Sequence, residues 1–278
     1  MPEITVLMPV WNREEYIKES IDSVLNQSFS DFELLIMDDG SKDRTIDIIK
    51  TYDDPRIRLE EREHDFIKNL NEGISLAKGN FIARMDSDDI MHHERLRIQL
   101  KRMKANPDID ICGTWIKPFD DEGNYNNHVN IGEYFIEDPI LEFLRSNFLM
   151  HPTVMIRKNI LLDNNLKYQD YYRTEDYKLW FEIAKAGCRF FIEPQILLYY
   201  RNSDKHMNIA CNEKQSLFRK RIKKEILDFL LSKYSKDTFK KIYLNMNKIE
   251  KEGFISGDDI AMFFYNLLHK IKTMKSMK

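Results

Sequence analysis

Short apolar runs alternate with helical segments over residues 4–113, and this alternation constrains the fold more than any other feature. Runs at 4–8, 32–37 and 81–85 are rich in β-branched and other apolar residues, which predicts buried strands. Apolar residues with a helical period follow at 14–26, 45–50 and 94–105. The connections are long enough for parallel crossovers, so we predict an α/β fold with a mostly parallel central sheet flanked by helices.

Polar clusters follow three of the predicted strands, directly after Met8, Met37 and Met85. In open parallel sheets, ligands bind in the crevice beyond the carboxyl ends of the strands. The sequence therefore predicts a binding site at this edge of the sheet.

The pattern is weaker after Gly113. Residues 115–134 are rich in turn formers, 154–156 and 190–192 suggest strands, and 175–186 suggests a helix. Two further amphipathic helices are expected at 215–233 and 260–271.

Composition places the chain among soluble globular proteins, with 42% hydrophobic residues over 278 positions. Three widely spaced cysteines fit a reducing compartment better than a disulfide framework. The N-terminus lacks the features of a signal peptide, and no apolar run approaches the ~20 residues of a membrane span. We expect a cytoplasmic protein, free or attached peripherally to the inner face of the cell membrane.

The stretch Asp86-Ser87-Asp88-Asp89 places three carboxylates at the end of a predicted strand. Such carboxylates repel one another, and a hard divalent cation relieves that repulsion. We predict a Mn²⁺ or Mg²⁺ site here, with Arg84 adjacent, that could bridge to phosphate oxygens. The alternative is a solvated acidic turn that caps the helix beginning near Glu94.

Three other clusters each allow a functional and a structural interpretation. Residues 38–43 could accept hydrogen bonds from a base or ribose, or form an Asp-Gly turn before a helix cap. Trp11 could stack on a nucleobase or lie in the core, and Asn12 could simply cap the next helix. The pair Glu175-Asp176 could supply a general base, or could only complement a helix dipole.

Together, and in this order, the clusters resemble the motifs of family 2 glycosyltransferases with the GT-A fold. The resemblance covers Pro9 to Glu14, Asp38 to Asp43, Asn71 to Gly79, Asp86 to Asp88, and the Glu175-Asp176 pair. Trp11 stands where the family pattern has Tyr or Phe, and the larger ring offers a suitable stacking face. The match is dense over residues 4–113 and sparser to about residue 206.

The resemblance implies an inverting, metal-dependent transferase that moves a hexose or N-acetylhexosamine from a nucleotide-diphosphate sugar, with UDP as the expected nucleotide. Trp11 and Asp39 would hold the base, Asp88 the metal, and Asp176 would deprotonate the acceptor with support from Glu175. The implied donor-binding residues are Pro9, Val10, Trp11, Asn12, Glu14, Asp39, Asn71, Arg84, Asp86, Ser87 and Arg201; the metal residues are Asp88, Asp86 and His206; and His151 would lie on the acceptor side.

The resemblance further implies that residues 1–206 form a catalytic domain, divided into a nucleotide-sugar half (1–113) and an acceptor half (114–206). Residues 207–278 would be a basic helical extension. The expected acceptor is a saccharide or lipid-linked saccharide of a bacterial surface polysaccharide, and no nucleic acid partner is expected. Two alternatives are a sugar nucleotidyltransferase, although no Gly-rich phosphate loop follows the first strand, and a noncatalytic nucleotide-sugar-binding module.

The charge distribution points to one more interaction. Residues 205–278 carry 17 Lys and Arg against 8 Asp and Glu, whereas the whole chain has a net charge of −3. This basic region and the apolar pattern at Leu217, Ile222, Ile226, Phe229 and Leu230 suggest peripheral contact with an anionic membrane. The same apolar face could instead pack on the catalytic body or form a homodimer, and the lysines could be no more than a solvated face.

Overall fold

The computed structural model describes residues 1–125, 134–202, 209–233, 237–251, 253 and 255–276. They form two compact units. The sheet unit comprises residues 1–136, 149–170 and 186–206, and the helical unit comprises 137–148, 171–185 and 207–278. The division into a catalytic domain at 1–206 and an extension at 207–278 stays a prediction, because a compact unit is not by itself a functional domain.

The sheet unit is built on a nine-stranded sheet in the order β3-β2-β1-β4-β8-β6-β9-β5, with β7 paired to β9. Strands β3, β2, β1 and β4 are parallel, as are β6 and β9, whereas β8, β5 and β7 run antiparallel to their neighbours. This confirms the predicted α/β class with a mostly parallel sheet. The strands are β1 (Ile4–Val10), β2 (Phe32–Asp38), β3 (Ile57–Glu61), β4 (Phe81–Arg84), β5 (Ile90–Met91), β6 (Ile111–Phe119), β7 (Tyr134–Phe135), β8 (Met155–Arg157) and β9 (Phe190–Arg201).

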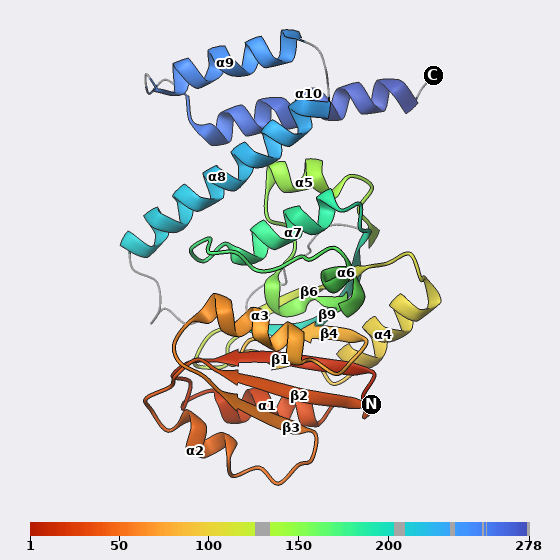
Figure 1. Cartoon of the computed structure of the whole chain (residues 1–278), viewed down its shortest axis with the longest axis vertical. Coiled ribbons are helices and arrows are strands. Elements are labelled where there is room, and N and C mark those ends of the chain that lie inside the picture. The colour runs from red at the N-terminus through yellow and green to blue at the C-terminus, as the bar shows by residue number, and fades with distance from the viewer. Residues whose placement is uncertain (126–133, 203–208, 234–236, 252, 254, 277–278) are drawn as a thin grey trace. The chain divides into compact units, whose positions relative to one another are not determined.

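Helices cover both faces of the sheet (Figure 1). Alternate residues of β1, such as Val6 and Met8, join a core with Ile21 of α1 and Leu100 of α4. Leu7 points the other way, toward α3. Both faces of β1 are therefore buried, which explains its continuous apolar sequence. The helices of this unit are α1 (Ile17–Leu25), α2 (Thr45–Ile49), α3 (Phe66–Leu76), α4 (Arg95–Ala105), the 3₁₀ turn η1 (His151–Thr153) and α6 (Lys158–Asp163).

Two glycines of the segment from Asn71 to Gly79 allow α3 and β4 to approach β1 closely. A β-carbon at Gly73 would lie 2.6 Å from Leu7 Cδ1, and one at Gly79 would lie 2.4 Å from the backbone nitrogen of Thr5. Both distances are far below van der Waals contact. These motif positions therefore serve the packing of the sheet.

The expectation of turns throughout residues 115–134 was wrong for its first part, because β6 continues to Phe119. Residues 126–133 lie outside the described part of the chain. Beyond Thr114 the strand has a partly exposed face that carries Trp115 and Lys117, so it lacks the unbroken apolar run of a strand buried on both faces.

A buried arginine fixes the end of β4, where the acidic stretch begins. The Arg95 side chain is fully buried, and its guanidinium donates to the carbonyls of Arg84 at 2.9 Å and Val154 at 3.3 Å. Its Nε donates to Gln99 Oε1 at 3.0 Å. Burial lowers the pKa of Arg95 to about 9, so the group still carries its charge at neutral pH. This cation lies beneath the acidic loop and ties β4 to β8.

Replacing Arg95 by methionine should lower the free energy of unfolding by about 3 kcal/mol, because the buried carbonyls of Arg84 and Val154 and the Gln99 side chain each lose a bond to a charged donor. The exposed Arg97 on the same helix pairs with Glu94, and Arg97→Met should change that free energy by less than about 0.5 kcal/mol. Urea unfolding followed by circular dichroism measures both. Equal midpoints for the two variants would contradict the role assigned to Arg95.

The helical unit contains α5 (Pro139–Arg145), α7 (Glu175–Lys185), α8 (Ile209–Lys233), α9 (Asp237–Lys251) and α10 (Gly257–Ser276). Helix α8 contacts α5, α7 and α10. Ile222, Ile226 and Leu230 are buried in this packing, while Leu217 stays exposed. Three of the five residues on which membrane contact was predicted are therefore used for packing inside the unit. Among the described residues, no helix combines the length and apolar character that crossing a bilayer requires.

Candidate active site

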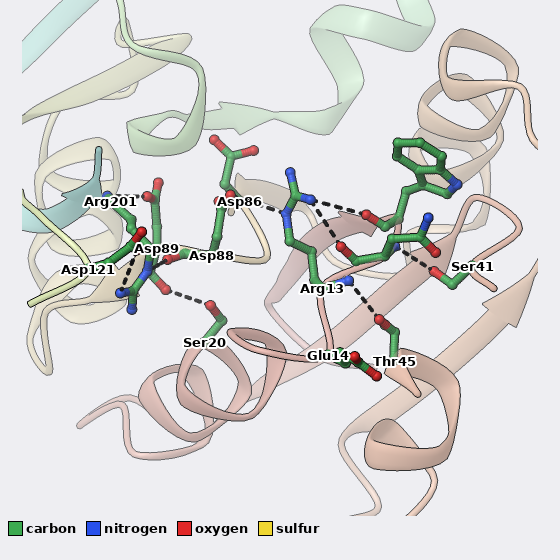
Figure 2. A network of polar contacts seen from close by, with 12 residues as sticks. Arg13, Glu14, Ser20, Ser41, Thr45, Asp86, Asp88, Asp89, Asp121 and Arg201 are labelled. Atoms are coloured by element: carbon green, nitrogen blue, oxygen red, sulfur yellow. Dashed lines mark hydrogen bonds and ion pairs between the residues drawn. The ribbon is translucent and has the colours of Figure 1, made fainter. Parts of the chain in front are cut away.

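The three polar clusters lie at one edge of the sheet, as predicted from their positions directly after three strands. Strands β2, β1 and β4 are parallel neighbours, with Val10 opposite Asp38 and Leu7 opposite Arg84. The segments after these strands are therefore adjacent, and the acidic stretch lies between Arg13, from the loop after β1, and Arg201, at the end of β9 (Figure 2). Pro9 and Val10 are part of β1 itself, with Val10 buried and its carbonyl accepting from Asp39 N at 2.9 Å.

A reciprocal hydrogen-bond lattice joins the loop after β1 to the loop after β2 (Figure 2). Asn12 N donates to Ser41 Oγ at 3.0 Å, and Asn12 Oδ1 accepts from Lys42 N at 2.8 Å. Glu14 Oε2 accepts from Arg44 N at 2.9 Å, while Glu14 N donates to Asp43 Oδ2 at 3.1 Å. Side chains of each loop therefore accept hydrogen bonds from the backbone of the other loop, which fixes the two loops against one another.

This lattice changes the interpretation of two residues. Asn12 does not cap helix α1, whose N-cap is Tyr16 without a side-chain hydrogen bond; the suggested cap was wrong. Asn12 has a φ of +50°, a left-handed conformation that asparagine tolerates better than most residues. Asn12 and Glu14 were both predicted to bind the donor, and their hydrogen bonds position the loop that carries Trp11.

Trp11 is exposed beside His64, which was not among the predicted site residues. Its side chain is 47% exposed, so the alternative of a core tryptophan was wrong. The rings of Trp11 and His64 lie 5.2 Å apart with an interplanar angle of 32°. His64 follows β3 at the same edge of the sheet, so the strand-end rule could have singled it out. The two rings form an open aromatic surface.

Asp39 lies buried beneath this surface. Its Oδ1 accepts from Asp65 N at 2.7 Å and from the Asn69 amide, and its Oδ2 lies 2.8 Å from His64 Nδ1. A carboxylate has about four acceptor sites, so Oδ2 retains capacity for a further donor. The predicted contact between Asp39 and a base is therefore compatible with its position.

Asp86 and Asp88 each face an arginine. Asp86 Oδ1 lies 2.6 Å from Arg84 Nη1, and Asp88 Oδ2 accepts from Arg13 Nε at 3.2 Å. Arg13 also donates to the carbonyls of Trp11 and Asn12 (Figure 2). Burial and the charge of Asp86 raise the pKa of Asp88 above its ordinary value. Arg13 was not among the predicted site residues, although it lies inside the first motif.

Two aspartates suit a cation whose remaining ligands come from a substrate. Mg²⁺ is commonly held by one or two carboxylates together with substrate phosphates. Within the described ranges, no group of three or more His, Cys, Asp and Glu side chains is arranged to hold a metal. Asp86 and Asp88 stand close enough for each charge to act on the other, and a divalent cation would relieve that repulsion. His206, the third predicted ligand, lies outside the described residues.

Asp89 and Arg201 lock the acidic loop to the end of β9. Asp89 Oδ1 accepts from Arg201 N at 2.8 Å, and Arg201 Nε donates to the Asp88 carbonyl at 2.8 Å. The Arg201 side chain is only 7% exposed, lies over the rings of Tyr16 and Phe119, and pairs with Glu19. Asp89 does not cap α4, which begins at Arg95 after an N-cap at Glu94; that suggestion was wrong. These contacts favour a positioning role for Arg201, and its predicted contact with the diphosphate stays a prediction.

Asn71 and His151 are linked by hydrogen bonds to the same residue of the sheet unit, Tyr168. Both ends of the Asn71 amide bond the backbone of Tyr168, at 3.0 and 2.9 Å, and the Tyr168 hydroxyl lies 2.7 Å from His151 Nε2. Burial and the positive charge of Arg84 hold the pKa of His151 well below its ordinary value. His151 is therefore neutral at pH 7. The donor-side role of Asn71 and the acceptor-side role of His151 stay predictions.

The predicted base lies in the helical unit, at the start of α7. Asp176 Oδ2 accepts from Asn147 Nδ2 at 3.0 Å, and its Oδ1 accepts from Tyr177 N at 2.6 Å. Both bonds favour the ionised carboxylate, as does the N-terminal end of the helix dipole. Glu175 is the first residue of α7. Asn147 lies 29 residues away in the sequence, so no local pattern connected it with Asp176.

Sequence comparison assigns the family. The sequence profile described as "Glycosyl transferase family 2" matches residues 5–165. The chain is 31% identical over 224 residues to an uncharacterized glycosyltransferase, MJ1057, of Methanocaldococcus jannaschii, covering 78% of this chain and 77% of that protein. It is 33% identical over 210 residues to the O-antigen biosynthesis glycosyltransferase WbnJ of Escherichia coli, covering 73% and 80%. The chain belongs to glycosyl transferase family 2.

Solved structures support the fold. The structure of S. aureus TarS 1-349 in complex with UDP-GlcNAc matches with a TM-score of 0.65 at 21% identity, covering 82% of this chain and 72% of that one. The mannosyltransferase PcManGT from Pyrobaculum calidifontis, in complex with GDP-Man and Mn²⁺, matches with a TM-score of 0.59 at 16% identity, covering 80% and 63%. The protein is thus a glycosyltransferase with the GT-A fold, which removes the nucleotidyltransferase and noncatalytic alternatives.

Proposed function

We propose that this enzyme transfers a hexose or N-acetylhexosamine from a UDP-sugar to a saccharide or lipid-linked saccharide, with inversion at the anomeric carbon. The observation that carries the proposal is the arrangement of one exposed aromatic surface and one acidic pair on adjacent strand ends. A nucleotide-diphosphate sugar has matching parts, a flat base at one end and a charged diphosphate at the other.

The nucleobase would stack on Trp11, with Asp39 Oδ2 accepting a hydrogen bond from the base. Base–aromatic stacking contributes about 1–3 kcal/mol per base. The loop lattice through Asn12 and Glu14 would hold Trp11 in place before the donor arrives, which reduces the entropy lost on binding. S. aureus TarS 1-349, which shares the fold, has been solved in complex with UDP, and this is consistent with a uracil base here.

The diphosphate would lie at Asp86 and Asp88, the residues that would hold Mn²⁺ or Mg²⁺. When bound, such a cation supplies charge neutralisation for the leaving diphosphate. Arg13 bonds Asp88 at 3.2 Å and would contribute a second positive charge to the diphosphate once this pairing is released. Arg95 and Arg201 would keep the loop in place from below and from β9.

Asp176 would remove the proton from the acceptor hydroxyl, whose oxygen then attacks the anomeric carbon from the face opposite the diphosphate. Asn147 would orient this carboxylate, and Glu175 would support it. An ordinary ionised aspartate suffices as the base, because the proton leaves the hydroxyl as the new bond forms. No covalent intermediate with the enzyme is required.

Replacing Trp11 by alanine should weaken UDP binding by roughly 5- to 100-fold, because the stacking surface is lost. Trp11→Phe should retain most of the affinity. Phe135 has the same exposed fraction, 47%, and Phe135→Ala provides the control, with UDP affinity unchanged. Isothermal titration calorimetry with UDP and Mn²⁺ measures all three. Equal affinity of Trp11→Ala and the wild type would place the base elsewhere.

A donor screen tests the proposed function as a whole. Thermal unfolding of the full chain is recorded with UDP-, GDP- and dTDP-sugars, each with Mn²⁺ and with EDTA, and release of the nucleoside diphosphate is followed in parallel. We expect a UDP-sugar to raise the unfolding temperature in the presence of Mn²⁺ and much less in EDTA. Stabilisation by GDP-sugars alone would replace the UDP assignment.

The biological setting follows from the same proposal. WbnJ is named for O-antigen biosynthesis, and we propose that this chain likewise builds a cell-surface polysaccharide. Its donors would then be cytoplasmic nucleotide sugars, and a lipid-linked acceptor would bring the enzyme to the inner face of the cell membrane.

A further inference from the structure

The helical unit contains a groove between α8, α9 and α10 that transfer chemistry does not use. Its volume is about 890 Å³. Four nearly buried residues contribute to its apolar floor: Leu227, Tyr243, Ile260 and Ala261. Two leucines on its lining are exposed instead, Leu217 at 66% and Leu244 at 53%. The groove therefore offers apolar surface to an external ligand.

Positive charge dominates the rest of the lining, which includes Lys220, Arg221, Lys223, Lys224 and Lys251 against one acid, Glu250. Arg221 pairs with Glu225 at 3.3 Å, and Lys223 pairs with Asp258 at 2.6 Å. Lys220, Lys224 and Lys251 are exposed, and none of them takes part in an ion pair identified among the described residues. The groove thus has three cations available for an anionic ligand.

The helical spacing explains how one helix serves both packing and binding. Leu217, Lys220 and Lys224 follow one another at intervals of three and four residues, so they share a face of α8. Ile222 and Ile226 lie on a different face and are fully buried in the unit. The basic face of α8 is therefore a separate feature from its apolar packing face.

We propose that this groove binds an anionic membrane lipid, with the phosphate at the three lysines and the first part of the acyl chains along Leu217 and Leu244. An anionic lipid has both a negative charge for the lysines and an apolar chain for the exposed leucines. An acidic peptide would match the lysines but would leave the exposed leucines without an apolar partner. The groove would thereby attach the helical unit to an anionic bilayer.

The size of the effect follows from the charges. Each lysine close to an anionic bilayer contributes roughly a factor of five to partitioning. Replacing Lys220, Lys224 and Lys251 together by glutamine should therefore weaken binding on the order of 100-fold. Replacing Leu217 and Leu244 by serine should weaken it by roughly tenfold, which electrostatic attraction alone would not produce.

The test is co-sedimentation of the full chain with phosphatidylcholine vesicles that contain or lack phosphatidylglycerol. The matched control is Lys68→Gln, Lys78→Gln and Lys101→Gln, three exposed lysines of the sheet unit, which changes the net charge equally. We expect the wild type and the control to bind only the anionic vesicles, and the groove variants to lose binding. All of these residues are exposed, so circular dichroism should show unchanged folding.

Three results would overturn the proposal. The triple groove variant could bind like the wild type, or the control could lose as much binding as the groove variant. The third is that polyglutamate binds the chain through the same three lysines while vesicles do not bind, which would indicate an acidic protein partner. The readout is binding alone, so a failure of the proposed transfer reaction would leave this test unaffected.

Discussion

Replacing Asp176 by asparagine should lower kcat by roughly 10²- to 10⁴-fold while donor affinity stays unchanged, because the amide cannot accept the acceptor proton. The change preserves the shape of the side chain. After a half-turn of the Asn147 amide, whose Nδ2 faces Asp176 in the wild type, the new amide can donate to Asn147 Oδ1, which has no hydrogen-bond partner within the described part of the chain. The fold of the helical unit should therefore survive, and the loss should be confined to chemistry.

Three measurements distinguish a role of Asp176 as the general base from a purely structural role. Transfer to the acceptor is followed with the donor at saturation, donor affinity is measured by calorimetry, and the unfolding temperature is compared with the wild type. The control is Asp163→Asn, which alters an exposed carboxylate at the end of α6. Near-normal transfer by Asp176→Asn would assign the base to another residue, and a loss of donor affinity would indicate that Asp176 shapes the donor site.

The strand ends of this protein could be predicted because the information is local. Strands β1 and β2 are buried on both faces and are therefore mostly apolar, and the polar residues that follow mark where they stop. The positions of Trp11, Asp39 and Asp88 at one edge followed from that rule. What the rule could not supply is which of the polar side chains face outward.

The contacts of these side chains depend on residues far away in the sequence. Arg201 N binds an aspartate 112 residues earlier, and Tyr168 binds an asparagine 97 residues earlier. No periodicity or motif encodes such pairs, so Arg201 was expected at the diphosphate although its guanidinium lies over two rings and pairs with Glu19. Arg13 was missed for the same reason, since its partner Asp88 comes from another loop.

Replacing Asp88 by alanine should remove the metal dependence of donor binding. In the wild type, Mn²⁺ should tighten UDP-sugar binding by roughly 10²-fold, because the cation neutralises the diphosphate between the protein and the donor. The variant should bind the donor with one weak affinity, whether Mn²⁺ or EDTA is present. Calorimetry under both conditions measures the difference directly, independently of any acceptor.

The pairing of Asp88 with Arg13 sharpens this test. In the wild type, the guanidinium of Arg13 must leave Asp88 before a cation can take that oxygen, so the two positive groups compete for one carboxylate. In Asp88→Ala the guanidinium loses this partner and can turn to the diphosphate. The affinity measured in EDTA should therefore stay equal to the wild-type value or exceed it, while the affinity measured in Mn²⁺ falls.

A matched carboxylate distinguishes loss of a ligand from loss of charge. Glu19 belongs to the same polar network but faces Arg201, and its side chain is 57% exposed. Glu19→Gln removes the same charge as Asp88→Ala and should keep the full response to Mn²⁺. If both variants lost that response equally, the metal effect would arise from the overall charge of the site. If neither lost it, the cation would be held by residues other than Asp88.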